Sequence, residues 1–385
     1  FKEALNCYHK AIHIKPDYYE AHHNKGNVLR KTNDFVNAIE SFDKALKIKS
    51  DYLPALKNIT ELHVMQKNFS EAIKMLDRIS IYDPSNVKTY MQKANIFFEK
   101  NFFKEGIKNY QTAYDLNPEH PFLLGDFIHA NAKICHWKDF DNQLKKLEKN
   151  ILNKNESTNP FIASTLFDSP KLSYETAKIW EGHFKSKNND YKKYLGTNKK
   201  KIKLGFYSAD FRTHAMGHLM VQMLESHDKS LFELHGFYFG PTINNQDLLQ
   251  KRILKCFDSF NEIKYQDDQS VFDLSKKLEI DIAIDMMGHT GDNNRFTIFL
   301  KKLAPIQINF LGYPGTSGSK AIDYIVADKV IIPERNQKYF TEKIIYLPDT
   351  YQANEDIKKI SDKNLTKEMF GLPQDKFIFC SFNSN

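Results

Sequence analysis

The sequence predicts an α-solenoid of repeated helix pairs, followed by an α/β domain of the doubly wound, Rossmann-like kind. Two observations support this prediction. In the first third of the chain, one pattern of aromatic, small and proline residues returns every 34 residues. After residue 201, short apolar runs alternate with amphipathic stretches, as expected for a mostly parallel sheet covered by helices.

The repeat is present in four phased copies. Its columns are Phe1, Phe35, Phe69 and Phe103; Ala4, Ala38, Ala72 and Gly106; Ala11, Ala45, Ile79 and Ala113; and Pro16, Ser50, Pro84 and Pro118. Small residues at fixed places let paired helices approach closely, and proline ends a helix because it has no amide hydrogen. This unit resembles a tetratricopeptide repeat, so we assign residues 1–130 to such repeats and expect further repeats upstream.

An amide column follows the same register. Asn24, Asn58 and Gln92 stand 34 residues apart, each on the first helix of a repeat. A carboxamide offers both a donor and an acceptor, which suits the backbone of an extended peptide. Since solenoids bind partners on their concave face, we predict that this column binds a protein or peptide substrate. Solvated polar residues without such a role are the alternative.

A helical junction and linker is expected over residues 131–200, and the α/β domain over residues 201–385. The predicted strands are 204–207, 234–239, 280–285, 306–311, 324–327, 344–346 and 377–382. The predicted helices are about 218–226, 246–255, 269–278 and 294–302. No G-x-G-x-x-G or G-x-x-x-x-G-K-[ST] follows a strand, which argues against a nicotinamide, flavin or P-loop site.

Composition excludes several classes of protein. The net charge of +7 is spread over amphipathic helices, which indicates solvated faces and not a nucleic-acid groove. No apolar run is long enough to span a membrane. The four cysteines are far apart and form no C-x-x-C, which fits a reducing compartment, so we expect a cytoplasmic protein.

Three polar loops follow predicted strands and are expected to meet at one edge of the sheet. They are 208–217, 287–294 and 311–318. Their glycines allow backbone to come close to a ligand, and helix starts after the first two loops favour an anion. A phosphorylated ligand is therefore predicted here, with His214 and His289 at hand. His214, in a strand-to-helix loop, is the candidate general base, although a lone histidine is more often structural.

A metal site is disfavoured. His214 and His218 could form a zinc pair with His289, but Gly217 is expected to interrupt any helix between the first two, and the pair encloses no glutamate. The single D-x-D, Asp139 to Asp141, is predicted on an exposed helix, away from any strand end. We therefore predict no metal.

The loops together resemble the protein O-linked N-acetylglucosamine transferase family and its SPINDLY-like relatives. The resemblance rests on G-F-Y-S-A-D-F-R-T-H-A-M-G-H (205–218), M-G-H-T (287–290) and A-P-I-Q-I-N-F-L-G-Y-P-G-T-S-G (304–318). It extends through 323–328, 370–373 and 379–383, and 134–141 resembles the junction after the family's repeats.

The resemblance implies repeats followed by a two-lobed GT-B glycosyltransferase. Such an enzyme transfers N-acetylglucosamine from UDP-GlcNAc to serine or threonine hydroxyls, with inversion and without a metal or other cofactor. His214 matches a proposed base, and Thr290, Leu311, Gly312, Tyr313 and Pro314 match positions near the donor sugar and phosphates. Since the chain ends where the second lobe would begin, we expect the lobe that supplies most nucleotide contacts to be missing and the chain alone to be inactive.

Two alternatives remain open. The same architecture could use another donor, such as GDP-fucose in a SPINDLY-type protein O-fucosyltransferase. The α/β half could also be non-catalytic, which would make the protein a repeat scaffold. The presence of His214, Thr290 and the 311–318 loop argues against the scaffold.

Overall fold

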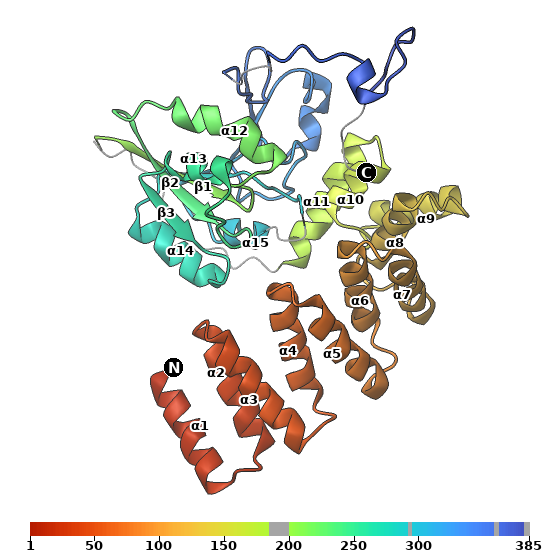
Figure 1. Cartoon of the computed structure of the whole chain (residues 1–385), viewed down its shortest axis with the longest axis vertical. Coiled ribbons are helices and arrows are strands. Elements are labelled where there is room, and N and C mark those ends of the chain that lie inside the picture. Colours follow the sequence, from red (N-terminus) through yellow and green to blue (C-terminus); the bar gives the residue numbers. More distant parts are fainter. Residues whose placement is uncertain (185–199, 292–294, 358–361, 381–385) are drawn as a thin grey trace. The chain divides into compact units, whose positions relative to one another are not determined.

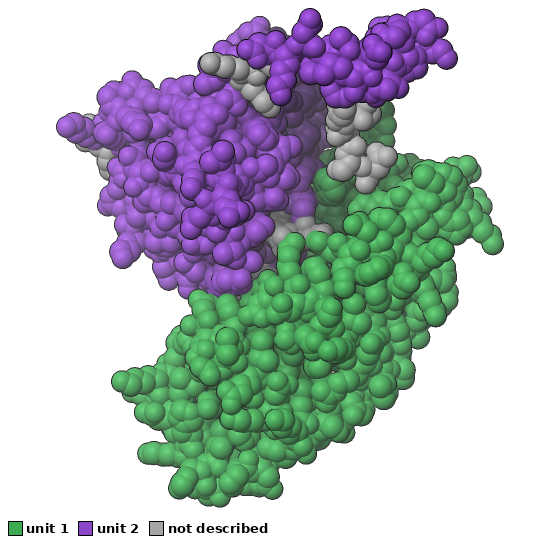
Figure 2. Space-filling view, viewed as in Figure 1, with its two compact units in different colours: residues 1–183 green, residues 184–385 purple. Residues whose placement is uncertain are grey.

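The computed structural model describes residues 1–184, 200–291, 295–357 and 362–380 (Figure 1). It divides into two compact units, residues 1–183 and 184–385, which are coloured separately in Figure 2. The first unit is entirely helical, and the second contains one sheet with helices on both faces. None of the helices in these ranges has both the length and the apolar character of a membrane span.

The first unit consists of antiparallel helix pairs with the predicted 34-residue phase. Its repeat helices are α1 (Lys2–Ile14), α2 (Tyr19–Lys31), α3 (Phe35–Ile48), α4 (Leu53–Met65), α5 (Phe69–Tyr82), α6 (Val87–Glu99) and α7 (Phe103–Leu116). The small columns are buried, as expected: Ala38, Ala72, Ala45 and Ala113 are fully enclosed. A Cβ at Gly106 would lie 2.5 Å from the ring of Phe98, so this position needs glycine.

Four further helices complete this unit. They are α8 (Leu123–Lys133), α9 (Phe140–Leu152), α10 (Pro160–Leu166) and α11 (Pro170–His183). Leu124, Ile128, Leu147, Ile151 and Leu172 form their shared core. They cover most of the region that we assigned to the junction, whereas residues 185–199 of the predicted linker lie outside the described residues.

In the described part of the second unit, all seven strands are parallel. In chain order they are β1 (Ile202–Ser208), β2 (Phe232–Tyr238), β3 (Ser259–Glu262), β4 (Ile282–Asp285), β5 (Ile306–Asn309), β6 (Tyr324–Ala327) and β7 (Lys343–Tyr346). Their order across the sheet is β3-β2-β1-β4-β5-β6-β7. The helices are α12 (Ala215–Glu225), α13 (Leu248–Leu254), α14 (Asp268–Lys277) and α15 (Phe296–Phe299), with 3₁₀ turns η1 (Glu334–Tyr339) and η2 (Glu368–Phe370).

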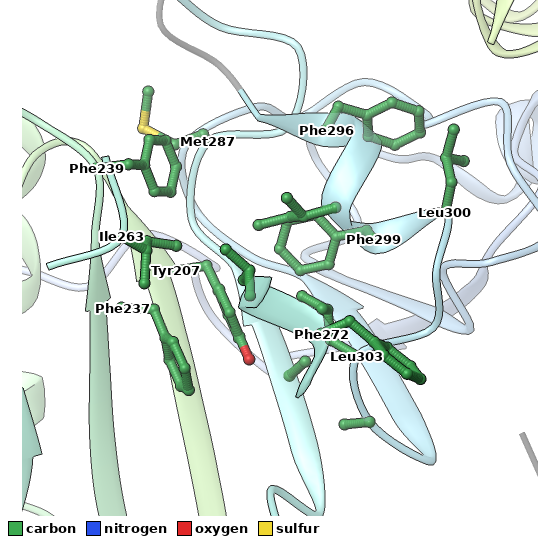
Figure 3. Close-up of a cluster of buried hydrophobic side chains, with 14 of the residues drawn as sticks. Tyr207, Phe237, Phe239, Ile263, Phe272, Met287, Phe296, Phe299, Leu300 and Leu303 are labelled. Atoms are coloured by element: carbon green, nitrogen blue, oxygen red, sulfur yellow. The ribbon is translucent and has the colours of Figure 1, made fainter. Parts of the chain in front are cut away.

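Successive side chains of a strand point to opposite faces of the sheet, so the hydrophobic core of this unit is divided into one cluster on each face. Tyr207 and Phe237 stack at 4.2 Å on the face that Phe272 of α14 helps to cover (Figure 3). Their chain neighbours Phe206 and Tyr238 belong to the opposite cluster, with residues of α12 and α13. Both faces of the sheet are therefore buried, which explains why the strands are continuous apolar runs.

Three sequence predictions differ from the structure. The short edge strand β3 was not predicted, because three of its four residues are polar. Phe377–Cys380 of the predicted last strand is irregular, and residues 381–382 lie outside the described ranges. Gly217 does not interrupt a helix; it lies within α12, buried, where a Cβ would be 2.1 Å from the carbonyl oxygen of Arg212.

Candidate active site at the switch point of the sheet

The strand order reverses direction between β1 and β4. From β1 the chain adds β2 and β3 on one side, and then returns to place β4 and the later strands on the other side. Loops that leave such neighbouring strands diverge and open a crevice at their carboxyl ends, where ligands of doubly wound sheets bind. The loop that follows β1 leads to His214, and the loop that follows β4 leads to Thr290.

The loop after β1 is held rigidly by α13. Asp247 accepts hydrogen bonds from both the amide and the hydroxyl of Thr213, at 2.7 Å each, and it also caps α13. Gln250, buried on the same helix, donates to the carbonyl oxygen of Phe211 at 2.9 Å. Although desolvation opposes it, these hydrogen bonds to Asp247 lower the pKa of its carboxyl on balance. The residue before His214 is thus fixed in place.

His214 forms the N-cap of α12. Its Nδ1 lies 3.3 Å from the amide nitrogen of Met216, and its side chain is 39% exposed. A side-chain acceptor at this position satisfies an amide that the helix leaves free. The cap orients the imidazole, and while Nδ1 accepts from Met216 the neutral ring carries its proton on Nε2.

Asp210 is a residue that sequence analysis did not select. Its carboxylate is 9% exposed and lies 3.4 Å from Nδ1 of His214 and 3.2 Å from the guanidinium of Arg212. Nδ1 can accept from Met216 or, once protonated, face the carboxylate, but it cannot bond to both as a neutral acceptor. An Asp four residues before the candidate base, directly after a strand, was the available signal.

The loop after β4 is organised by a buried carboxylate. Asp285, the last residue of β4, accepts from the amides of Met287 and Gly288, both at 2.9 Å, through one oxygen. Desolvation raises its pKa to about 6. Thr290 is half-buried, and its hydroxyl donates to the carbonyl oxygen of Met287 at 2.6 Å. Residues 292–294, the end of this predicted loop, lie outside the described ranges.

The loop after β5 contains the other predicted donor residues. Leu311 is buried in a left-handed conformation (φ 77°), Tyr313 is buried, and Pro314 is exposed. A Cβ at Gly312 would lie 1.9 Å from the carbonyl oxygen of Met286, so this loop and the loop after β4 touch through backbone. Desolvation, with a smaller contribution from Glu342, raises the pKa of the Tyr313 phenol.

Glu342, which no sequence signal indicated, braces the same loop. One of its carboxylate oxygens accepts from the Ser317 amide at 2.6 Å, and the other accepts from the Thr316 hydroxyl at 2.7 Å. His289 is also buried here, with Nε2 2.9 Å from the Ser317 carbonyl oxygen. Its pKa falls to about 4 because burial disfavours the charged ring. His289 is therefore a neutral structural residue and not a solvent-facing catalytic group.

The comparison with protein families locates this site within a known domain. Residues 176–364 match the model of glycosyl transferase family 41, and residues 29–94 match a tetratricopeptide repeat model. The second unit is therefore similar to the glycosyltransferase domain of that family. The matched range includes His214, Thr290 and all of 311–314, together with Asp210 and Glu342.

Two curated proteins are similar to a large part of the chain. The chain is 27% identical over 279 residues to a probable UDP-N-acetylglucosamine–peptide N-acetylglucosaminyltransferase SEC of Arabidopsis thaliana, covering 66% of this chain and 28% of that protein. It is 28% identical over 271 residues to a UDP-N-acetylglucosamine–peptide N-acetylglucosaminyltransferase of Caenorhabditis elegans, covering 61% and 22%. The chain thus spans under a third of the length of these relatives.

A solved structure supports the fold of this chain. The structure of a mutant O-GlcNAc transferase of Thermobaculum terrenum aligns with a TM-score of 0.55 and 19% identity, over 87% of this chain and 58% of that one. The alignment extends over most of both units, in agreement with helical repeats followed by the parallel sheet.

The three amides of the repeats have different surroundings. Asn58 on α4 donates to Asn27 at 2.7 Å and to Nε2 of His23 at 2.9 Å, so both of its N–H groups are engaged across to α2. Its carbonyl oxygen is what remains to meet a ligand. Asn24 is half-buried on α2, and Gln92 is exposed on α6.

The structure brings no metal-ligand set together in the ranges it describes. No group of three His, Cys, Asp or Glu side chains with suitable spacing occurs among those residues. His218 is exposed on α12, whereas His289 is buried against Phe296 and Tyr313. The zinc arrangement of His214, His218 and His289, which the sequence analysis disfavoured, is therefore not assembled among the described residues.

Proposed function

We propose that the protein transfers N-acetylglucosamine from UDP-N-acetylglucosamine to serine or threonine hydroxyls of proteins in the cytoplasm. The observation that carries this proposal is the family 41 match, which includes the loops at the switch point of the sheet. The names of the relatives from Arabidopsis thaliana and Caenorhabditis elegans support the same donor and a peptide acceptor.

His214 is proposed as the general base. In the tautomer whose Nδ1–H faces Asp210 instead of capping α12, Nε2 has a free lone pair and takes the proton of the acceptor hydroxyl while the hydroxyl oxygen attacks the anomeric carbon of the sugar. The bond from that carbon to the UDP oxygen breaks, and its electron pair leaves with the diphosphate. A single displacement of this kind inverts the anomeric centre. Asp210, 3.4 Å from Nδ1, stabilises the imidazolium that forms.

The donor is proposed to lie against Thr290 and Leu311, Gly312, Tyr313 and Pro314. The close backbone contact at Gly312 and the cap of α12 gather amide groups at this edge, and amides stabilise negative charge that grows on a leaving diphosphate. We propose that this stabilisation replaces a metal ion and that no other cofactor takes part.

The repeats are proposed to bind the protein acceptor through Asn24, Asn58 and Gln92. The carbonyl oxygen of Asn58 accepts from a peptide N–H, while Gln92 offers both of its groups. Backbone recognition of this kind accepts many side-chain sequences, which suits an enzyme with several protein substrates.

The decisive experiment replaces His214 with Asn in the intact protein. Asn is a good N-cap, so α12 keeps its cap while the ring base is lost. We expect transfer from labelled UDP-N-acetylglucosamine to fall about 100-fold or more, with unchanged donor binding. His218→Asn, an exposed substitution on the same helix, is the matched control.

Parallel assays with GDP-fucose and with a chelator test the remaining features. Faster turnover of GDP-fucose than of UDP-N-acetylglucosamine would contradict the proposed donor. Loss of transfer in the chelator, restored by a divalent cation, would contradict the metal-independent step. Transfer by His214→Asn at the normal rate would contradict the role of His214 as base, whereas no transfer by the unaltered intact protein would leave the repeat scaffold as the better interpretation.

A further inference from the structure

A polar groove lies between α2 and α4 in the repeat unit. It has a volume of about 580 Å³ and opens to solvent. We call it the α2/α4 groove. Its floor contains the hydrogen-bonded side chains of His23, Asn27 and Asn58, and its rim contains Arg30, Lys31, Lys57 and Glu61.

The rim of the groove is cationic. It carries three basic side chains and one acidic side chain, and Glu61 is already paired with Arg30 at 2.6 Å. Lys31 and Lys57 are exposed, and within unit 1, which is described throughout, neither has an ion-pair partner. Two ammonium groups therefore stand at this open polar groove without a carboxylate partner, since its one carboxylate, Glu61, is paired with Arg30.

The floor supplies hydrogen-bonding groups but no further charge. His23 is buried among Phe42 and Tyr52, and desolvation lowers its pKa. Its Nε2 accepts from Asn58, so the ring is neutral. The floor is fixed before any ligand arrives, and the net charge of the groove comes from the rim.

This charge does not continue into the next step of the solenoid. A shift of 34 residues replaces Arg30 and Lys31 by Val64 and Met65, and it replaces Lys57 by Met91. The equivalent positions of the next groove are thus apolar. A uniform anionic polymer would favour cations that continue along the solenoid, whereas a single cationic step fits one acidic place in an extended chain.

The helix dipole does not explain the whole cluster. Arg30 and Lys31 stand in the last turn of α2, where cations stabilise a helix end. Lys57, however, is in the second turn of α4, near the positive end of that helix, where a cation gains nothing. The position of Lys57 on the rim of the groove is better explained by the binding of a negatively charged ligand.

We propose that the α2/α4 groove binds an acidic segment of a protein substrate, with Lys31 and Lys57 paired to its carboxylates and Asn58 accepting from its backbone. This inference rests on the proposed recognition of protein acceptors by the repeats. It adds a preference for glutamate or aspartate at one place in the bound segment, because the charge does not continue into the next step of the solenoid.

Binding to the chain is measured by fluorescence anisotropy without any donor. The probe is a labelled twelve-residue peptide with two central glutamates, and its reference has glutamines in their place. We expect the glutamate peptide to bind about tenfold more tightly in low salt, an advantage that disappears as salt is raised. Equal affinity for the two peptides would overturn the proposal.

The double variant Lys31→Glu/Lys57→Glu is expected to lose this preference. Its matched control is Lys10→Glu/Lys47→Glu, with the same change of charge on exposed positions of α1 and α3. Circular dichroism verifies that both variants fold. An equal loss of affinity in the control would show that net charge alone attracts the peptide, against the proposal.

An oligodeoxythymidine of similar length tests the other anionic partner. Tighter binding of this oligonucleotide at Lys31 and Lys57 would overturn the assignment to an acidic peptide. Since the assay needs no sugar donor, failure here leaves the transferase proposal standing. Conversely, inactive transfer with intact peptide binding would contradict only the transferase proposal.

Discussion

Nε2 of His289 lies 2.9 Å from the carbonyl oxygen of Ser317, and this contact joins the loop after β4 to the loop after β5. The ring is enclosed by Phe296 and Tyr313, and its Nδ1 has no hydrogen-bond partner among the described residues. The buried imidazole of His289 is therefore neutral and donates from Nε2. Because protonation would place a charge in this buried position, the stability of the contact between the two loops depends on pH.

His289 and Asp285 should give the α/β unit opposite dependences on pH. The folded pKa of His289, about 4, is below its usual 6.5, so its contribution to stability is lost as pH falls from 6.5 to 4. The folded pKa of Asp285, about 6, is above its usual 3.8, so its contribution is lost as pH rises from 3.8 to 6. Within its own pH range, each group changes the free energy of unfolding by about 1.4 kcal/mol per pH unit.

Single variants separate the two contributions. His289→Gln keeps an N–H donor and removes the titration, so its stability is expected to rise from pH 7 to pH 5. Asp285→Asn keeps the acceptor for Met287 and Gly288, and its stability is expected to fall over the same range. Hydrogen exchange of β4 and β5 amides provides the measurement; parallel pH profiles of the two variants would contradict the assignment.

Gly312→Ala is expected to destabilise the α/β unit by about 1–3 kcal/mol, because the new methyl group would meet the carbonyl oxygen of Met286 at 1.9 Å. Gly182→Ala is the matched control: nothing lies within 4 Å of its Cβ position on α11. That change is expected to stabilise its helix by up to about 1 kcal/mol. Urea denaturation of both variants checks the contrast, which an undiminished stability of Gly312→Ala would refute.

Asp247→Ala is expected to slow transfer about tenfold, since Thr213 loses both hydrogen bonds and the His214 loop is no longer fixed. Loss of the α13 cap should also cost about 1 kcal/mol. Asp267→Ala removes an equivalent N-cap, from α14, and is the control for stability alone. If both variants lose the same activity, the loop contact has no special role.

Asp210→Asn is expected to reduce kcat by about 10- to 100-fold, because the imidazolium at His214 loses a facing negative charge. KM for the donor should stay the same. Asp281→Asn is the matched control: Asp281 is equally buried, but it binds the Lys203 amide at the amino edge of the sheet. A change of KM without a change of kcat would argue for a structural role of Asp210.

The sequence predicted the repeats because one pattern returned four times, and buried columns such as Ala38 and Ala45 are unambiguous. It also predicted six of the strands, since fully buried parallel strands are apolar throughout. β3 was missed because an edge strand of four residues carries little apolar signal. The start of α12 was placed too late because a histidine N-cap is less usual than Ser, Thr, Asp or Asn.

Of the candidate site, the sequence indicated the residues that stand on the loops but not the carboxylates that hold them. Asp247 is 34 positions from Thr213, and Glu342 is 25 positions from Ser317, so neither pairing has a local pattern. The sequence also could not show that His289 is enclosed while His214 is partly exposed. Burial of a single side chain depends on the packing of several segments, which periodicity does not report.

The pairing of β1 with β4 has a consequence for how the chain folds. The Lys203 amide bonds to the Asp281 carboxylate at 2.9 Å, across 78 positions of the chain. Contacts of such long range slow folding, whereas helices α2 to α7 pack against their immediate neighbours in the sequence. During synthesis, the solenoid is therefore expected to fold before β4 has been made and can pair with β1. The candidate active site, which lies at this pairing, is expected to form after the repeats.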